Sequence, residues 1–199
     1  MHDIERFKKQ LAFILEIDKE KNIYRQTHLS GHGRAENDAE HAWHMAVMAY
    51  LLREYANEPV DIAKTMMMIL IHDIVEIDAG DTYAYDEERK KSQAVREQQA
   101  ADRLFGLLPE DQGRELRELF DEFEACETKE ARFAKTMDNF QPMLLNDSND
   151  GGDWVEHGCI ARSRIEKRNE PTGQGSSFIR AYVQTLIEKH IKEGHIKDE

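Results

Sequence analysis

Residues 60–81 read VDIAKTMMMILIHDIVEIDAGD, and this stretch decides the fold. Apolar side chains fall on nearly every side of a helix drawn through residues 60–77, which is typical of a helix at the centre of a bundle. That helix ends in two titratable residues, His72 and Asp73. Because an unpaired carboxylate is costly to bury, Asp73 needs a compensating partner, which is either a metal ion or a salt bridge.

The rest of the chain shows helical periodicity and predicts an all-α fold. Asn37 and Glu40 have the spacing of a capping box, so a helix is expected to begin near Asp38 and to end before Pro59. The other expected helices cover residues 4–15, 86–107, 110–125, 129–145, 154–168 and 177–190. Residues 22–38 are expected to form a loop, and no strand is predicted.

Composition predicts one soluble domain over residues 1–199, with 40% hydrophobic and 34% charged residues. The net charge of -13 disfavours binding to long DNA or RNA and favours a small substrate. Neither a membrane span nor a secretory signal is visible, so a cytoplasmic location without a membrane partner is expected. The cysteines, Cys126 and Cys159, stand far apart and are interpreted as reduced thiols.

Two further residues belong with the titratable pair. His41 lies near the start of the predicted helix at Asp38, and Asp138 interrupts an apolar helical stripe. Together with His72 and Asp73 they form a mixed nitrogen and oxygen set that suits a first-row divalent ion with open coordination positions. The alternative interpretation is a satisfied core histidine beside a helix-end carboxylate, and spacing alone does not decide between the two.

Two more carboxylates follow this pair. Glu76 comes four residues after His72, on the same face of a continuous helix, and Asp81 follows the flexible Gly80. Like charges this close raise each other's pKa, which is how a carboxylate becomes a general acid near neutral pH. The apolar residues between the acids argue against a merely solvated helix end.

These residues resemble the HD-domain hydrolases, and in particular the branch of the bacterial 5'-deoxynucleotidases and their eukaryotic relatives. The resemblance rests on Arg25, the segment RAENDAEHAW at 34–43, HDIVE at 72–76, Gly80-Asp81 and Asp138. It implies an HD-domain helical bundle with a metal site between the central helices.

The resemblance also implies roles for individual residues. The residues that match metal ligands are His41, His72, Asp73 and Asp138. Glu76 and Asp81 match the residues that transfer protons and position the attacking water, and Arg25 matches an arginine that contacts phosphate. One departure is Gln26, where relatives of the nucleotidase type commonly carry tryptophan, so recognition of the base and sugar stays open. His44 lies one turn beyond His41, but the family pattern places the ligand directly after Ala-Glu.

The predicted function is a metal-dependent phosphohydrolase, in particular a 5'-nucleotidase that releases phosphate from (deoxy)nucleoside 5'-monophosphates. Its cofactor would be one divalent ion, Mn²⁺, Co²⁺, Fe²⁺ or Mg²⁺. A phosphodiesterase or nucleoside triphosphate hydrolase of the same fold is an alternative, but the basic residues near the motifs, Arg25, Arg34 and Lys135, favour a single phosphate. A non-catalytic module that binds metal or nucleotide is the other alternative.

Two expectations concern the surface. Relatives are commonly dimers, so a homodimer is expected, with the face at residues 115–123 as a candidate interface. The remaining histidines are expected at the surface: His2, His28, His32, His157, His190 and His195.

Overall fold

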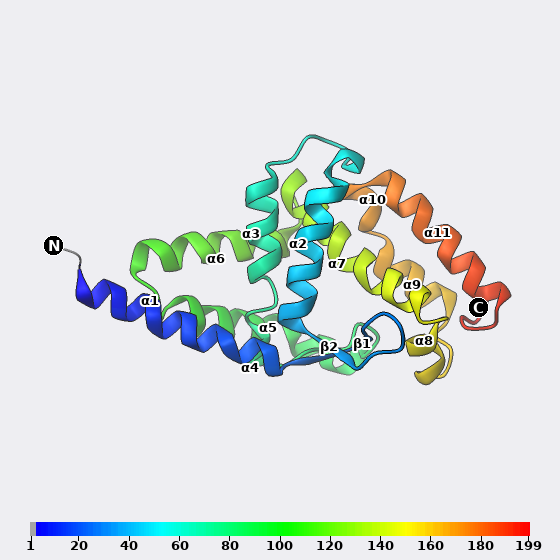
Figure 1. Cartoon of the computed structure of the whole chain (residues 1–199), viewed down its shortest axis with the longest axis horizontal. Coiled ribbons are helices and arrows are strands. Elements are labelled where there is room, and N and C mark those ends of the chain that lie inside the picture. Colours follow the sequence, from blue (N-terminus) through cyan, green and yellow to red (C-terminus); the bar gives the residue numbers. More distant parts are fainter. Residues whose placement is uncertain (1–2) are drawn as a thin grey trace.

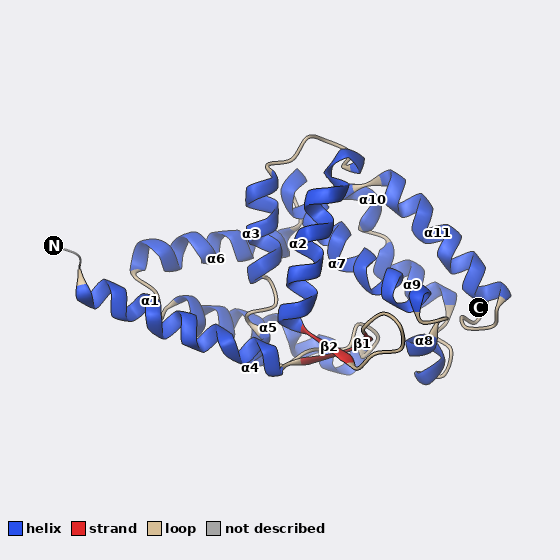
Figure 2. Cartoon of the chain, viewed as in Figure 1, coloured by secondary structure: helices blue, strands red, loops and turns tan. Residues whose placement is uncertain are grey.

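Helices make up most of the molecule (Figure 2). The structure is a computed structural model, and it describes residues 3–199 apart from the side chains of Glu87, Arg89 and Lys90. The all-α prediction is confirmed. The helices are α1 (Ile4–Ile17), α2 (Asp38–Leu52), α3 (Ile62–Ile71), α4 (Glu76–Ala79), α5 (Glu87–Phe105), α6 (Glu110–Ala125), α7 (Lys129–Ser148), α8 (Gly152–Glu156), α9 (Arg162–Asn169), α10 (Thr172–Gly175) and α11 (Ser177–Lys192). The strands are β1 (Tyr24–His28) and β2 (Ala35–Asn37), and short 3₁₀ helices cover Asp18–Asn22 and Arg53–Tyr55.

Helices α2, α3 and α7 occupy the centre of the molecule, with α1, α5 and α6 toward one end and α8 to α11 toward the other (Figure 1). One cluster of buried apolar side chains joins α2, α3, α7 and α11 and includes Met68 and Met137. A second cluster joins α1, α5 and α6 and includes Leu104. The second cluster also takes residues from 71–79, beginning with Ile71 at the end of α3, whereas Met68 and Ile69 of α3 belong to the first. His72 therefore lies where the two cores meet.

The central helix is shorter than the continuous apolar run at 60–77 predicts. Helix α3 ends at Ile71, and α4 begins only at Glu76. His72 Nδ1 lies 2.8 Å from the carbonyl oxygen of Ile69, so the side chain takes up one of the carbonyls that the end of the helix exposes. Because of this break, His72 and Glu76 do not lie on one face of a continuous helix, as the sequence predicted.

Residues 22–38 contain an antiparallel hairpin, so the expectation of a loop without strands is wrong. Tyr24 pairs with Asn37, and the register shifts along the ladder. Strands of five and three residues are too short to show a clear alternation in the sequence. The predicted capping box is confirmed: Asn37 Oδ1 accepts from the Glu40 N–H at 2.9 Å, and the Asn37 N–H donates to Glu40 Oε2 at 3.2 Å.

The helix expected at 154–168 is also wrong, because the segment divides into α8 and α9. Gly158 and Cys159 between them have φ values of 81° and 58°. Both lie in the left-handed region, which a continuous right-handed helix cannot contain.

Two surface expectations are corrected by burial. Phe120 and Phe123 are each 1% exposed and belong to the two cores, so the apolar face at 115–123 packs inside the chain rather than on a second subunit. Self-association itself stays a prediction. His190 is fully buried, whereas His2 lies outside the described residues.

Among residues 3–199, no helix combines the length and the apolarity needed to cross a membrane.

Packing of α10 on α7 leads to a first prediction. A Cβ added to Gly175 would meet the carbonyl oxygen of Arg132 and the hydroxyl of Thr136 well inside van der Waals contact. Gly175→Ala should therefore lower the free energy of unfolding by about 2 kcal/mol, measured by urea denaturation. Gly173→Ala is the matched control, because the nearest atom there is a flexible Arg180 carbon at 3.5 Å. Equal stability of the two variants would contradict this packing.

Candidate functional site

Three central elements bring the four predicted metal-site residues together. His41 comes from the first turns of α2, His72 and Asp73 from the turn after α3, and Asp138 from the middle of α7. Ligand atoms of His41, His72 and Asp73 all lie within 4.8 Å of one another. Asp138 Oδ1 lies 3.5 Å from His41 Nε2, and all four side chains are buried. The sequence grouping of these residues therefore corresponds to a cluster in space.

The two imidazoles present the same nitrogen to the cluster. His41 Nδ1 lies 3.0 Å from Gln141 Oε1, and His72 Nδ1 lies 2.8 Å from the Ile69 carbonyl. Both partners are acceptors, so each Nδ1 carries the proton and each neutral ring keeps a lone pair on Nε2. His72 Nε2 lies 3.1 Å from Asp73 Oδ1 and His41 Nε2 lies 3.5 Å from Asp138 Oδ1, so both buried Nε2 atoms face carboxylate oxygens, and no group among residues 3–199 donates to them. Two inward lone pairs beside two carboxylates are a donor set that fits a divalent cation.

A second layer of polar groups fixes His41. The Gln141 amide nitrogen donates to Glu36 Oε1 at 2.7 Å and lies 3.2 Å from His44 Nδ1, which leaves the Gln141 oxygen facing His41. Such partners commonly set the tautomer and ring orientation of a metal-binding histidine. His44 thus belongs to this supporting layer, in agreement with the choice of His41 as the ligand candidate.

The electrostatics of the cluster favour added positive charge. Burial acts to raise the pKa of Asp73, but His72 and Arg25 outweigh it and hold the pKa well below its usual range. Burial likewise acts to raise the pKa of Asp138, but Lys135 outweighs it and lowers this pKa well below its usual range. Lys135 Nζ lies 3.0 Å from Asp138 Oδ2. Burial opposes charging of His72, yet Asp73 raises its pKa to about 9. In the metal-free protein His72 therefore also carries a proton on Nε2, toward Asp73, at neutral pH, and a bound cation would take the place of this proton.

Glu76 and Asp81 lie beside this cluster and line the same cavity as Asp73 and Asp138. Glu76 is only 7% exposed, and burial together with the charges of Asp73 and Asp38 raises its pKa to about 11. Glu76 therefore carries a proton at neutral pH, as a general acid requires.

Arg25, from β1, pairs with two carboxylates at the cavity wall. Its Nη1 atom donates to Asp73 Oδ2 at 2.7 Å and to Asp38 Oδ1 at 3.1 Å. The residue predicted to contact phosphate therefore also orients Asp73. Asp38, which sequence reasoning missed, is fully buried, and burial together with Asp73 raises its pKa to about 7. Its only sequence signal is its place in the segment at 34–43.

The cavity carries three cationic side chains, Arg25, Lys135 and Arg168. Arg34, which the sequence grouped with the motifs, instead pairs with Glu40, its Nη1 lying 2.8 Å from Oε2. Arg168 comes from α9, and its Nη2 lies 3.9 Å from Asp138 Oδ1. Nothing in the local sequence marked Arg168, because its approach depends on the break between α8 and α9.

The cavity lining also includes polar and aromatic groups, among them Gln26, Tyr83 and Tyr85. The Tyr83 ring lies against the His157 ring with centroids 4.6 Å apart, and His157 Nε2 lies 3.3 Å from Gln26 Oε1. The lining thus combines cationic, acidic and aromatic side chains within one cavity.

Comparison with known proteins defines the class of this fold and site. A model of the HD domain matches residues 17–179, so the chain belongs to the HD-domain family and the resemblance is confirmed. A solved structure from Magnetospirillum magnetotacticum, described as a predicted metal-dependent phosphohydrolase, is 47% identical, has a TM-score of 0.92, and covers 97% of this chain and 96% of its own.

Among curated relatives, the chain is similar to "5'-deoxynucleotidase HDDC2" of Mus musculus, with 29% identity over 139 residues, 70% of this chain and 66% of the relative. The Homo sapiens protein of the same name is 32% identical over 111 residues, 56% of this chain and 53% of the relative. The match thus spans about half to two thirds of the length of these relatives.

Buried Glu20 beside the cluster leads to a second prediction. Burial and the charges of Asp73 and Asp38 raise its pKa to about 8. Between the ordinary pKa near 4.5 and this value the folded state holds a proton that the unfolded chain releases, so stability falls as pH rises through that window. The stability of Glu20→Gln relative to the parent protein should therefore increase as the pH rises from about 5 to about 8.5. Urea denaturation of the metal-free proteins at the two pH values measures this difference.

The exposed Glu118→Gln on α6 is the control for this pH dependence. A stability difference between Glu20→Gln and the parent that stays constant across the two pH values would contradict the assignment.

Proposed function

We propose that this chain is a metal-dependent phosphomonoesterase that releases phosphate from (deoxy)nucleoside 5'-monophosphates. The observation that carries the proposal is the convergence of two buried Nε2 atoms on two ionised carboxylates: His72 Nε2 lies 3.1 Å from Asp73 and His41 Nε2 lies 3.5 Å from Asp138. The names of the relatives, 5'-deoxynucleotidase and metal-dependent phosphohydrolase, support the same reaction class.

In this proposal His41, His72, Asp73 and Asp138 hold one divalent ion. When bound, the ion neutralises charge on a phosphate oxygen and lowers the pKa of a bound water. A set of two imidazoles and two carboxylates with open positions favours Mn²⁺, Co²⁺, Fe²⁺ or Mg²⁺ over a closed structural zinc site.

The chain's own residues would supply the remaining charge and proton transfer. Lys135 and Arg168 flank Asp138 and balance the negative phosphate in the cavity. Glu76, protonated at neutral pH, would donate its proton to the leaving 5'-oxygen. Asp81 would orient the attacking water. The raised pKa of Glu76 supports the acid role for this residue, and the positioning role for Asp81 is the complementary part of the same proposal.

A substrate panel separates this proposal from its alternatives. Phosphate release is measured with deoxynucleoside and ribonucleoside 5'-monophosphates, a phosphodiester and a nucleoside triphosphate, each with Mn²⁺, Co²⁺ or Mg²⁺. Turnover confined to the monophosphates is expected. Turnover of the diester or triphosphate alone would replace the proposed reaction, and no turnover of any substrate would favour a binding module.

The metal assignment predicts that Asp73→Ala loses the ion. Removing this buried carboxylate takes away a ligand and leaves Arg25 without one of its two partners. Equilibrium dialysis against Mn²⁺ should show a loss of affinity of roughly tenfold or more. Asp121→Ala, an exposed carboxylate on α6, is the control. Unchanged Mn²⁺ affinity in Asp73→Ala would contradict the assignment.

The acid assignment predicts that Glu76→Gln keeps the ion but loses turnover. The amide is nearly isosteric with the protonated carboxyl group but lacks its acidic proton, so kcat for the preferred monophosphate should fall by roughly 10² to 10⁴. Glu115→Gln, exposed on α6, should leave kcat unchanged. If Glu76→Gln retained full kcat, another group would have to supply the proton.

A further inference from the structure

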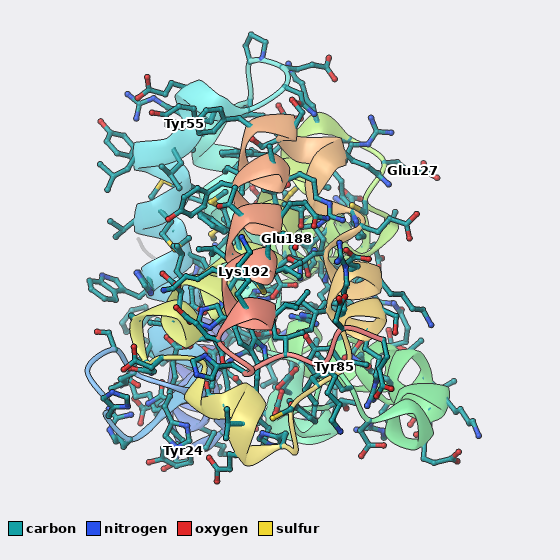
Figure 3. All side chains as sticks on the ribbon, turned by 90° about the vertical axis from the view of Figure 1, so that its right-hand side faces the viewer. Tyr24, Tyr55, Tyr85, Glu127, Glu188 and Lys192 are labelled. Atoms are coloured by element: carbon teal, nitrogen blue, oxygen red, sulfur yellow. The ribbon has the colours of Figure 1, made fainter. Side chains whose placement is uncertain are left out.

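The C-terminal end of α11 carries a second cluster of ligand side chains, at the opposite end of the molecule from α1. Figure 3 shows α11 on the face toward the viewer, with Glu188 and Lys192 labelled on it. Beyond Lys192 the chain reverses at Gly194, which has φ 80°. The His195 and Ile196 N–H groups both donate to the His190 carbonyl, at 2.9 and 3.2 Å. This reversal brings the His195 ring next to the His190 ring, with the ring centroids 5.2 Å apart.

Three ligand atoms converge at this reversal. The Nδ1 atoms of His190 and His195 lie 2.9 Å apart. Glu193 Oε2 lies 3.4 Å from the first and 3.5 Å from the second. An ion bound at about 2.0–2.1 Å by each ligand places neighbouring ligand atoms roughly 2.9 to 3.4 Å apart, depending on geometry. The three separations thus have the size of the edges of one coordination polyhedron.

A buried hydrogen bond sets the tautomer of His190. Its Nε2 atom lies 3.0 Å from Asp147 Oδ1, and Lys189 Nζ lies 2.7 Å from the same oxygen. Lys189 and His190 outweigh the effect of burial and lower the pKa of Asp147, so this carboxylate is an acceptor. His190 Nε2 therefore donates, and the neutral ring keeps its Nδ1 lone pair for the cluster. A carboxylate behind a histidine is the usual support of a metal ligand.

Packing fixes both rings in place. His190 is fully buried, and its ring meets the Trp154 ring edge-on with centroids 4.9 Å apart. His195 lies directly against Gly151, where an added Cβ would come within 2.7 to 2.8 Å of its Cβ, Cγ and Nδ1 atoms. The Glu193 side chain is 43% exposed, which leaves an open side for a water ligand.

We propose that His190, Glu193 and His195 form a second divalent-metal site, of the kind that binds Zn²⁺, distinct from the cluster around His41. Two imidazoles, one carboxylate and one water make a tetrahedral zinc set. In the metal-free protein the His195 Nδ1 proton is donated to His190 Nδ1. On binding of the ion this proton would move to Nε2 of the His195 ring, which leaves both Nδ1 lone pairs for the metal.

The site would fasten the end of the chain to the rest of the protein. Directly after His195, Ile196 is buried in the first core. Lys197 then donates to the Ile160 carbonyl at 3.2 Å and accepts from the Arg162 N–H at 2.8 Å. Arg162 begins α9, the helix that carries Arg168 to the cavity. A zinc ion here would stabilise the anchor of α9 and so have a structural role.

The test measures Zn²⁺ content and thermal stability in an Asp73→Ala background, which removes a ligand of the first cluster. Each variant is dialysed against low-micromolar Zn²⁺, and the bound metal per chain is determined by atomic emission. His195→Gln in this background should bind one ion fewer per chain than the background itself. Zn²⁺ should raise the melting temperature of the background and not that of the His195→Gln variant.

The matched control is His32→Gln, an exposed histidine in the loop of the hairpin, which should keep both the ion and the stabilisation. Circular dichroism checks that each variant is folded, and Glu193→Gln, which changes an exposed side chain, tests the site without disturbing the packed rings. Equal Zn²⁺ content in the background, His195→Gln and Glu193→Gln would overturn the proposal.

Discussion

The structure depends on a cluster of buried titratable groups between α2, α3 and α7. The Nε2 atoms of His41 and His72 face Asp138 and Asp73, whose carboxylates stay ionised although they are buried. Burying such a group without compensation is costly, so positive charge has to be supplied. Arg25 and Lys135 supply part of it from the protein side, and the proposed ion would supply the rest.

Several features of the fold follow from this constraint. The capping box holds the start of α2 so that His41 points inward, and the end of α3 at Ile71 lets the next two residues reach the cluster rather than continue a helix. The hairpin carries Arg25 to the same point from outside the bundle. The two apolar cores on either side hold these elements together.

The sequence predicted the helical fold, the capping box and the residues of the cluster, because these signals are local or have the spacing of a known family. It missed the hairpin, whose strands are too short to show periodicity, and the break between α8 and α9, which depends on the backbone conformation at Cys159. It also missed Arg168 and the burial of His190. Both depend on where the chain returns after a turn, which side-chain periodicity does not encode.

The central claim is that one cation sits between the two Nε2 atoms and the two carboxylates. Crystals grown with Mn²⁺ and measured near the manganese absorption edge test this most directly. The account predicts an anomalous peak at roughly 2.0–2.3 Å from Nε2 of both His41 and His72, with Asp73 and Asp138 oxygens also bound. A peak bound through Nδ1, or no peak within this cluster, would contradict it.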